Sequence, residues 1–471
     1  MTDASVAIPA ANGTVAARVS RVAAADPHSH EAISGRREKF LPVTKHALVD
    51  RLTHESAWPH GDCMQARRFM RYLDYWRRHS YTMKLLEIEQ TYEPFSPDSD
   101  LLHTRAFGAE ERKVMQKRLV KEISELLEQA NFTRVDPANV HFILTKDSHY
   151  NLDLQVDLAA FEEVLIYYRG ATAIVERRRD FKKGWIGWKE VKIPVFQRLF
   201  LLFKLKPMEA RIREVMQEKN CARAEAEKEV HQARGLLPVN VSSDYVYLKL
   251  FKNMPRSDVE MIFPNTRVKF RLFDKIKFGV TAGGGLGMGV FGTATKVAAA
   301  SNPYTLAGAA LGLGSVAVRQ ASNFVAQRNR YMVVMAQNLY FHAMADNRGV
   351  MTLLADRAAE EDIKEEILLY SVLAKEQVNI RDLGAVDEAI EKYLGKTFVI
   401  DVDFDVEDAL RRLKMDGIVV ELPDGTLQTL PPREAALQID KLWDSCLDNL
   451  PDMVVEEGKE IEVDDQGIPA A

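Results

Sequence analysis

The sequence predicts a membrane-anchored α+β protein, on the basis of three observations. Amphipathic helical patterns and short β-rich runs occupy the first part of the chain, a nearly neutral glycine-rich stretch follows, and helix-helix-strand-strand patterning closes it. We therefore expect five segments in chain order. They are a disordered tail (1–35), a cytosolic α+β domain (36–270), a transmembrane helical hairpin (278–320), a helical and winged-helix-like acidic domain (321–450) and an acidic disordered tail (451–471).

Composition limits the size of any membrane part. The 471 residues are 28% charged and 46% apolar, which is ordinary for globular protein. The cysteines Cys63, Cys221 and Cys446 form no CxxC pair, so we predict neither a disulfide framework nor a structural zinc site. A reducing compartment fits this cysteine usage best.

Charge is divided unevenly along the chain. From Leu353 onward the sequence has 12 Lys and Arg against 30 Asp and Glu, a net charge of −18, whereas the preceding residues carry +13. This division indicates separate modules with different surroundings. The Ala/Ser-rich N-terminus lacks a charged region followed by an apolar one, so it does not read as a secretory signal.

The N-terminal elements are predicted to be helices. Apolar residues three and four apart between 38 and 95 predict two or three amphipathic helices. The loop PFSPDSD, with its two prolines, ends them. A further helix is expected from about Glu110 to Asn131.

Between 139 and 200 the pattern changes to short β-rich runs separated by Gly, Asp or Lys, which predict a small antiparallel sheet. We interpret RRRDFKKGWIGWK (177–189) as a solvated hairpin loop whose tryptophans pack on the sheet, with an anionic bilayer face as the alternative. The segment 208–235 is charged on all sides, which favours an exposed helix or a projecting hairpin. A strand and a helix capped by Ser257 are expected next.

The glycine-rich stretch does not fit a phosphate-binding loop. No glycine is followed by Lys-Ser/Thr at the P-loop offset, and Gly283-x-Gly285 lacks the x-x-G that opens a dinucleotide-binding helix. We predict no cofactor and no metal site.

A lipid environment fits this stretch better. Residues 278–295 contain no charge and would extend about 27 Å as a helix. A second helix is expected from Pro303 to Val318. Small residues four apart would pack the two helices together; they are Gly283, Gly285, Gly287, Gly289, Gly308 and Gly312. The alternatives are a helical hairpin in a soluble core and a re-entrant hairpin.

The flanking charges set the predicted topology. The basic residues Arg267, Lys269, Arg271, Lys275 and Lys277 precede the hairpin, Arg319 follows it, and Lys296 alone lies in the turn. The positive-inside rule then places both termini on the cytoplasmic side of the membrane. We expect this membrane to be the bacterial cytoplasmic membrane, or the mitochondrial inner membrane if the source is eukaryotic.

Beyond the hairpin, two long helices are predicted, broken near Asn347–Gly349, with glycine at the end that needs a positive φ. We expect His342 to be a packed core histidine. The acids at 360–366 resemble a carboxylate metal site in composition alone, and a solvated helix face is the favoured interpretation.

The region 378–432 has the order of a winged-helix module, with two strands joined by Pro-Asp-Gly. Its presumed recognition helix mixes acids and bases, namely Asp405, Glu407, Asp408, Arg411, Arg412 and Lys414. A module this acidic is poorly suited to DNA, so we expect protein docking and no nucleic-acid partner.

Several motifs resemble a known family. PRSDVEMIFP, the basic run with the glycine-rich hairpin after it, and QNLYFHAMADNRGVMTLLADRAAEEDIKEEILLYSVL resemble the transmembrane protein 143-like family. REKFLPVTKHALVDRL and the YEPFSPDSD loop are similar to its opening segment. The resemblance covers about residues 36–450. It implies a two-span membrane protein with a domain of unknown function and carries no catalytic residues.

These observations predict a non-enzymatic scaffold or recruitment protein held at the bilayer, with protein partners. One alternative is an oligomeric glycine-zipper pore, which would make the chain a homo-oligomer. The other is a membrane-surface enzyme without a recognisable motif, for which His141 and His149 are available. No catalytic residue is assigned.

Overall fold

The computed structural model describes the greater part of the chain. The described residues are 37–58, 62–98, 105–135, 153–179, 188–235, 237–238, 241–264, 267–269, 333, 336, 339–448 and 459–460.

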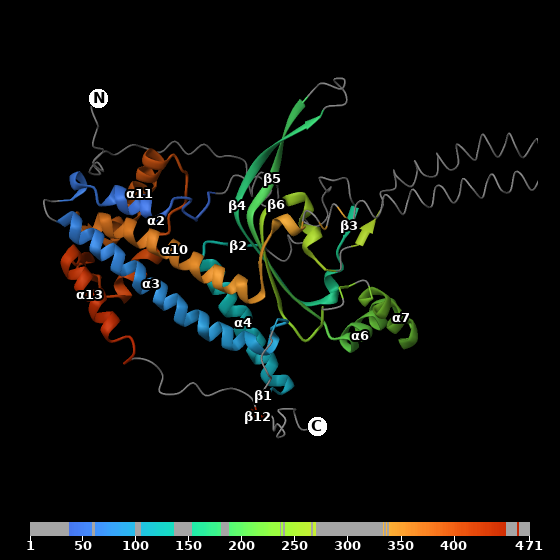
Figure 1. Cartoon of the computed structure of the whole chain (residues 1–471). Helices are drawn as coiled ribbons and strands as arrows, with labels where there is room; N and C mark the ends of the chain where they lie inside the picture. Colours follow the sequence, from blue (N-terminus) through green and yellow to red (C-terminus); the bar gives the residue numbers. More distant parts are fainter. Residues whose placement is uncertain are drawn as a thin grey trace, which may run out of the picture.

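A five-stranded antiparallel sheet forms the centre of the molecule, with the strand order β2-β4-β5-β6-β8. Its strands are β2 (Thr133–Arg134), β4 (Phe161–Arg179), β5 (Trp188–Leu205), β6 (Tyr247–Pro255) and β8 (Ala343–Asp346). The upper halves of β4 and β5 continue beyond the sheet as a two-stranded arm (Figure 1). The small antiparallel sheet predicted from the sequence is therefore confirmed, and two of the predicted short runs join into the single long strand β4.

The sheet buries both faces because its side chains alternate between them. On β4, Leu165 and Tyr167 point into one hydrophobic core, while Ile166 and Tyr168 point into a second core on the opposite face. Neighbouring strands β5 and β6 follow the same alternation. This two-sided burial explains why the strands read as nearly continuous apolar runs in the sequence.

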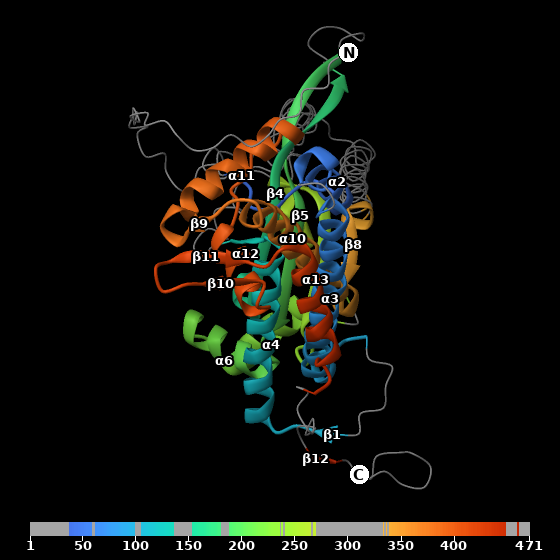
Figure 2. The same ribbon diagram turned by 90° about the vertical axis from the view of Figure 1, so that its left-hand side faces the viewer.

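Helices cover the first face. They are α2 (Lys45–Leu52), α3 (Asp62–Tyr92), α4 (Ala109–Gln129) and α10 (Asn347–Leu373). Figure 2 shows this helical layer in front of the sheet. The helix predicted near 110–131 is confirmed. The predicted break near 347 is confirmed too, but the residue with a positive φ is Asn347, and Gly349 lies inside α10.

The second face is covered by shorter segments. The 3-10 helix η5 (Arg256–Ile262) buries Val259 and Ile262 against it. It begins at Arg256, so the prediction that Ser257 caps a helix is wrong. At the lower end, α6 (Met208–Lys219) and α7 (Arg223–Arg234) form the projecting helical hairpin that the sequence predicts (Figure 1).

We call residues Val378–Asp448 the C-terminal module. It comprises β9 (Val378–Asn379), η6 (Ile380–Asp382), α11 (Leu383–Phe398), α12 (Val406–Met415), β10 (Val419–Glu421), β11 (Thr426–Thr429) and α13 (Pro432–Asp444). Its sheet has the order β10-β11-β9, and Gly425, with φ 83°, sits in the turn between β10 and β11. Core residues of this module, α3 and α10 belong to one continuous cluster.

Two short pairings complete the fold. β1 (Arg105–Ala106) pairs with β12 (Lys459–Glu460), and β3 (Asp153–Gln155) pairs with β7 (Arg267–Lys269). Three of the remaining turns are 3-10 helices: η1 (Glu55–Ala57), η2 (Glu93–Phe95) and η3 (Leu158–Ala160).

The predicted membrane-anchored fold requires correction. Among the residues that the structure describes, no helix is sufficiently long and apolar to span a bilayer. The three longest, α3, α4 and α10, carry charged side chains along most of their length. The fold class is therefore α+β on an antiparallel sheet. The predictions of two transmembrane helices and of a bacterial or mitochondrial inner-membrane location are wrong. They rested on segment 278–320, which lies outside the described residues.

Candidate functional site

A cluster of charged side chains lies buried between α10, α3 and α12. On α10, Glu361, Asp362, Lys364, Glu365 and Glu366 are each at most 3% exposed. The prediction that these acids form a solvated helix face is therefore wrong. Burying so many charges is costly unless each finds a partner.

Arg412 of α12 is the main partner. Its guanidinium contacts Glu365 at 2.6 Å, Glu366 at 2.8 Å and Asp362 at 3.1 Å. It also reaches Asp408, one turn earlier on its own helix, at 2.6 Å. The planar guanidinium has five N–H donors, which suits this many-sided contact.

Arg77 of α3 supplies the second cation. It lies 2.6 Å from Asp416 and 3.0 Å from Glu366. Trp76 donates its indole N–H to the other oxygen of Asp416 at 3.1 Å. The cluster thus joins the C-terminal module to α3 and α10.

The cluster contains more acids than bases, with five carboxylates around two guanidiniums. Burial raises the pKa of Glu365 to about 8, against the opposing field of Arg412. Burial likewise raises the pKa of Asp362 to about 6. Neutral donors support these acids, because Asn131 donates to Glu365 and the Tyr81 hydroxyl donates to Asp362 at 2.7 Å.

Carboxylate oxygens of Asp362, Glu365 and Asp408 lie within 4.8 Å of one another, a spacing that would suit a metal ion. The guanidinium of Arg412, however, contacts all three, so the positive charge between them comes from the chain itself. The arrangement functions as a structural ion-pair network.

The N-terminal segment 37–44 connects to the same helix. The Leu41 amide donates to Glu361 at 2.9 Å, and Lys364 donates to the Leu41 carbonyl at 2.6 Å. Arg37 pairs with Glu391 and Asp401 of the C-terminal module. The segment therefore contacts both α10 and the C-terminal module.

A shallow groove lies on the C-terminal module, between α12 and the start of α11. It has a volume of about 640 Å³ and is lined by Ile380, Leu383, Gly384, Glu407, Leu410, Arg411, Lys414 and Met415. Met415 is 74% exposed. The two bases are already paired, Arg411 with Asp408 and Lys414 with Glu421.

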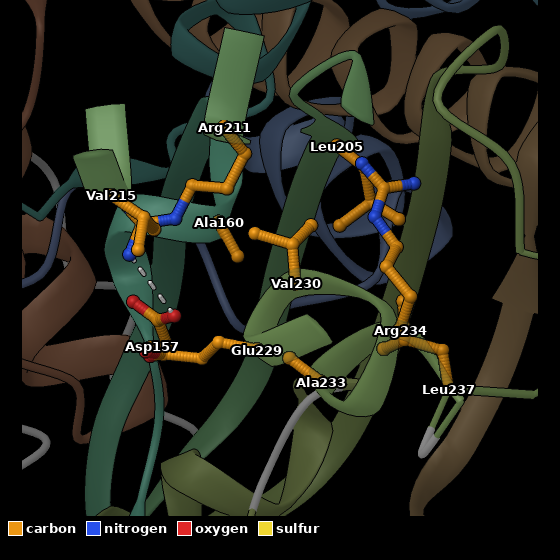
Figure 3. A pocket seen from close by; sticks show the side chains of 10 residues that line it. All are labelled: Asp157, Ala160, Leu205, Arg211, Val215, Glu229, Val230, Ala233, Arg234 and Leu237. Atoms are coloured by element: carbon orange, nitrogen blue, oxygen red, sulfur yellow. Dashed lines mark ion pairs between the residues drawn. The ribbon is translucent and has the colours of Figure 1, made fainter. Parts of the chain in front are cut away.

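A smaller cavity, of about 50 Å³, lies between the lower end of the sheet and the α6–α7 hairpin (Figure 3). Most of its wall is apolar, contributed by Ala160, Leu205, Val215, Val230, Ala233 and Leu237. Four charged residues, Asp157, Arg211, Glu229 and Arg234, complete the lining.

The residues singled out in the sequence do not converge on one site. The glycines of the predicted hairpin, the bases Arg271, Lys275, Lys277 and Arg319, and the histidines His141 and His149 lie outside the described residues. Arg267 and Lys269 lie on β7, paired with β3. His342 is half-buried next to the sheet edge, with Nδ1 2.8 Å from the Lys252 carbonyl oxygen, so it is less buried than expected.

Sequence reasoning missed Arg77 and Arg412 as cluster residues. Their partners lie 289 and 46 positions away along the chain, so no local spacing relates them. One signal was available: seven of the last fourteen residues of α10 are apolar and five are acidic, with no amphipathic face, which is typical of a helix buried all round.

Comparison with known proteins identifies one match. Residues 161–349 match the model of a family described as protein of unknown function (DUF3754). The matched part begins with β4 and ends in the first turn of α10, so it includes the α6–α7 hairpin and excludes the C-terminal module. No solved structure matches the chain.

Proposed function

We propose that this chain is a non-enzymatic interaction protein whose C-terminal module docks a basic, amphipathic segment of a partner protein. The groove between α11 and α12 carries this proposal. It is open, it has an apolar floor, and it is large enough for several side chains of a bound helix.

The apolar residues of the groove favour a helical partner. Ile380, Leu383 and Met415 present partly or largely exposed apolar surface beside the buried Leu410. A flexible methionine at such a surface adapts to different apolar side chains. The partner therefore offers apolar residues at helical spacing.

Charge favours a basic partner. Residues 378–448 contain 16 Asp and Glu against 8 Lys and Arg, a net charge of −8. Because the groove bases Arg411 and Lys414 are paired within the module, they do not reverse this field. A cationic segment would be steered to the module, whereas nucleic acid would be repelled.

A scaffold role is also supported by the attachment of the module. The ion-pair cluster of Arg412 and Arg77 fixes α12 against α10 and α3, so the groove is held in one orientation relative to the sheet. The finer relationship to the transmembrane protein 143-like family stays a hypothesis, based on the motifs quoted above such as QNLYFHAMADNRGVMTLLADRAAEEDIKEEILLYSVL, and it implies no activity.

Two synthetic peptides test the proposal on the full chain. Both carry leucines at positions i, i+3, i+4 and i+7 of a helix; one has lysines elsewhere and the other glutamates. Fluorescence anisotropy should show binding of the lysine peptide, with at least about tenfold weaker binding of the glutamate peptide. Duplex DNA serves as the third probe and should bind more weakly still.

The variant Met415→Gln should weaken binding of the lysine peptide about tenfold or more, because a methionine side chain gains about 1.5–3 kcal/mol on burial and glutamine leaves the charge of the groove unchanged. Met64→Gln is the matched control, since Met64 is 68% exposed on α3, outside the groove lining. Equal binding of both peptides, tighter binding of DNA, or equal effects of the two variants would overturn the proposal.

A further inference from the structure

We propose that the cavity between the sheet and the α6–α7 hairpin binds a small aliphatic monocarboxylate, with its carboxylate on the guanidinium of Arg234. Apart from Asp157 and Ala160, the residues that line this cavity belong to the part of the chain that matches the family of unknown function, and the site is independent of the docking groove.

The charged residues of the wall leave one cation without an acidic partner. Arg211 lies 3.5 Å from Asp157, and Glu229 pairs with Lys219. Within the described part of the chain, by contrast, Arg234 forms no ion pair; it donates to the backbone carbonyl of Lys206. The wall therefore has one positive charge that its own carboxylates do not neutralise.

Arg234 is held in place and partly removed from water. The hydrogen bond to Lys206 anchors the guanidinium just after the end of β5, and it uses one of five N–H donors. Burial lowers the pKa of Arg234, and the field of Asp244, which acts in the opposite direction, offsets this effect only in part. An anion in the cavity would relieve this cost.

The shape of the cavity restricts the ligand. Figure 3 shows Arg211 and Arg234 on opposite sides of Val230, so the free cation lies at one end and the Arg211–Asp157 pair at the other. Between them the wall is formed by side chains such as Ala160, Leu205 and Val230. A ligand with an anionic head and a short apolar body matches this arrangement, because its head would contact Arg234 and its body would contact the apolar wall.

The volume of the cavity and the charges in its wall restrict the class of ligand further. About 50 Å³ holds roughly four water-sized groups, so the ligand has a few carbons. A dianion such as phosphate is disfavoured, because Asp157 and Glu229 also line the cavity and would repel the second charge. A planar carboxylate can accept two parallel hydrogen bonds from an arginine.

The site can be tested by titrating the full chain with acetate, propionate and butyrate. Binding is monitored through the NMR chemical shifts of the methyl groups in α6 and α7. Affinity should rise about fourfold per added methylene, the factor that corresponds to ~0.8 kcal/mol. Propionamide, the neutral isostere, and inorganic phosphate should each bind at least about tenfold more weakly than propionate.

Three variants locate the binding. Arg234→Gln should weaken propionate binding at least about tenfold, and Ala233→Leu should block the cavity while leaving Arg234 in place. Arg213→Gln is the matched control, because Arg213 is exposed on α6, also donates to a backbone carbonyl, and is absent from the lining. Thermal unfolding of each variant verifies that the hairpin is folded.

Propionate that binds Arg234→Gln as tightly as the unmodified chain would overturn the proposal. So would equal affinities for propionate and propionamide, or a loss of binding in Arg213→Gln of the same size.

Discussion

Arg412 and its neighbour Arg411 show how differently two adjacent arginines can contribute. Arg411 has a side chain 59% exposed and pairs with Asp408 at the surface, whereas Arg412 has a side chain 7% exposed and contacts four carboxylates. Surface pairs contribute little to stability, while removal of one partner from a buried cluster leaves uncompensated charge.

Arg412→Ala should therefore lower the free energy of unfolding by about 3–5 kcal/mol. Arg411→Ala, the matched control, should change it by less than about 0.5 kcal/mol. Urea unfolding followed by circular dichroism measures both. Similar losses in the two variants would contradict the structural role of the buried cluster.

The raised pKa of Glu365, about 8, predicts a pH dependence of stability. Between the usual glutamate pKa and about 8 the folded chain holds a proton that the unfolded chain has released. The free energy of unfolding therefore falls as pH rises through this window, by up to about 1.4 kcal/mol per unit for one proton. Asp362, with its pKa near 6, adds to the fall at the lower end.

Glu365→Gln should flatten this slope and leave the protein at least as stable as the unmodified chain at about pH 8, because the amide carries no charge to bury. Urea midpoints measured from about pH 5 to about pH 9 test this. Glu407→Gln, at an exposed position of α12, should keep the original slope. Stability that rises with pH in the unmodified chain would refute the assignment.

At the scale of the elements, the backbone conformation of the long strand β4 requires a glycine at one position, Gly170. Gly170 has φ 73°, and a Cβ atom there would lie 2.5 Å from the Gln197 side-chain oxygen and 2.9 Å from Gln197 Cβ on β5. The backbone conformation and the close approach of β5 both exclude a larger side chain. Glu38 accepts hydrogen bonds from the amides of Gly170 and Ala171 at this position.

Gly170→Ala should destabilise the protein by about 1–3 kcal/mol. Gly384→Ala is the opposite case, since Gly384 lies in the first turn of α11 with nothing near its Cβ position. That substitution should stabilise by about 0.4–1 kcal/mol, because alanine loses less backbone entropy on folding. Thermal unfolding of the two variants should give shifts of opposite sign.

At the scale of the whole molecule, the sequence predicts local elements better than their assembly. Apolar spacing predicts the helix α4, charge patterning predicts an exposed helix or projecting hairpin at 208–235, where α6 and α7 lie, and turn chemistry predicts the strand pair around Gly425. These signals act over a few residues, so one sequence suffices to detect them.

Assembly was harder to predict because it depends on distant partners. Glu365 and Glu366 look like solvated acids until α12 brings Arg412 to them. The cavity beside Arg234 requires η3, β5, α6 and α7 together. The membrane prediction rested on the charge of one stretch, 278–320, which lies outside the described residues, and no described helix is long and apolar enough to span a bilayer.

Because the helical layer and the C-terminal module share one continuous hydrophobic core, we expect them to unfold together. Leu41 is 1% exposed and belongs to the core cluster that also contains Ile439 of α13. Leu41→Ala should cost about 2–5 kcal/mol. Tryptophan fluorescence, to which all five tryptophans contribute, including Trp76 and Trp443 at the α3–α13 contact, should shift together with circular dichroism; separate transitions would show independent domains.

The N-terminal segment 37–44 also sets the order in which this protein can mature. Arg37 and Lys39 bond with Asp401 and Asp405, 364 and 366 positions later. During synthesis Arg37 and Lys39 therefore leave the ribosome long before their acidic partners are made. These two residues cannot form the contacts until the chain has grown past residue 405. Products truncated before residue 401 would therefore lack both acidic partners and leave segment 37–44 exposed to chaperones and proteases.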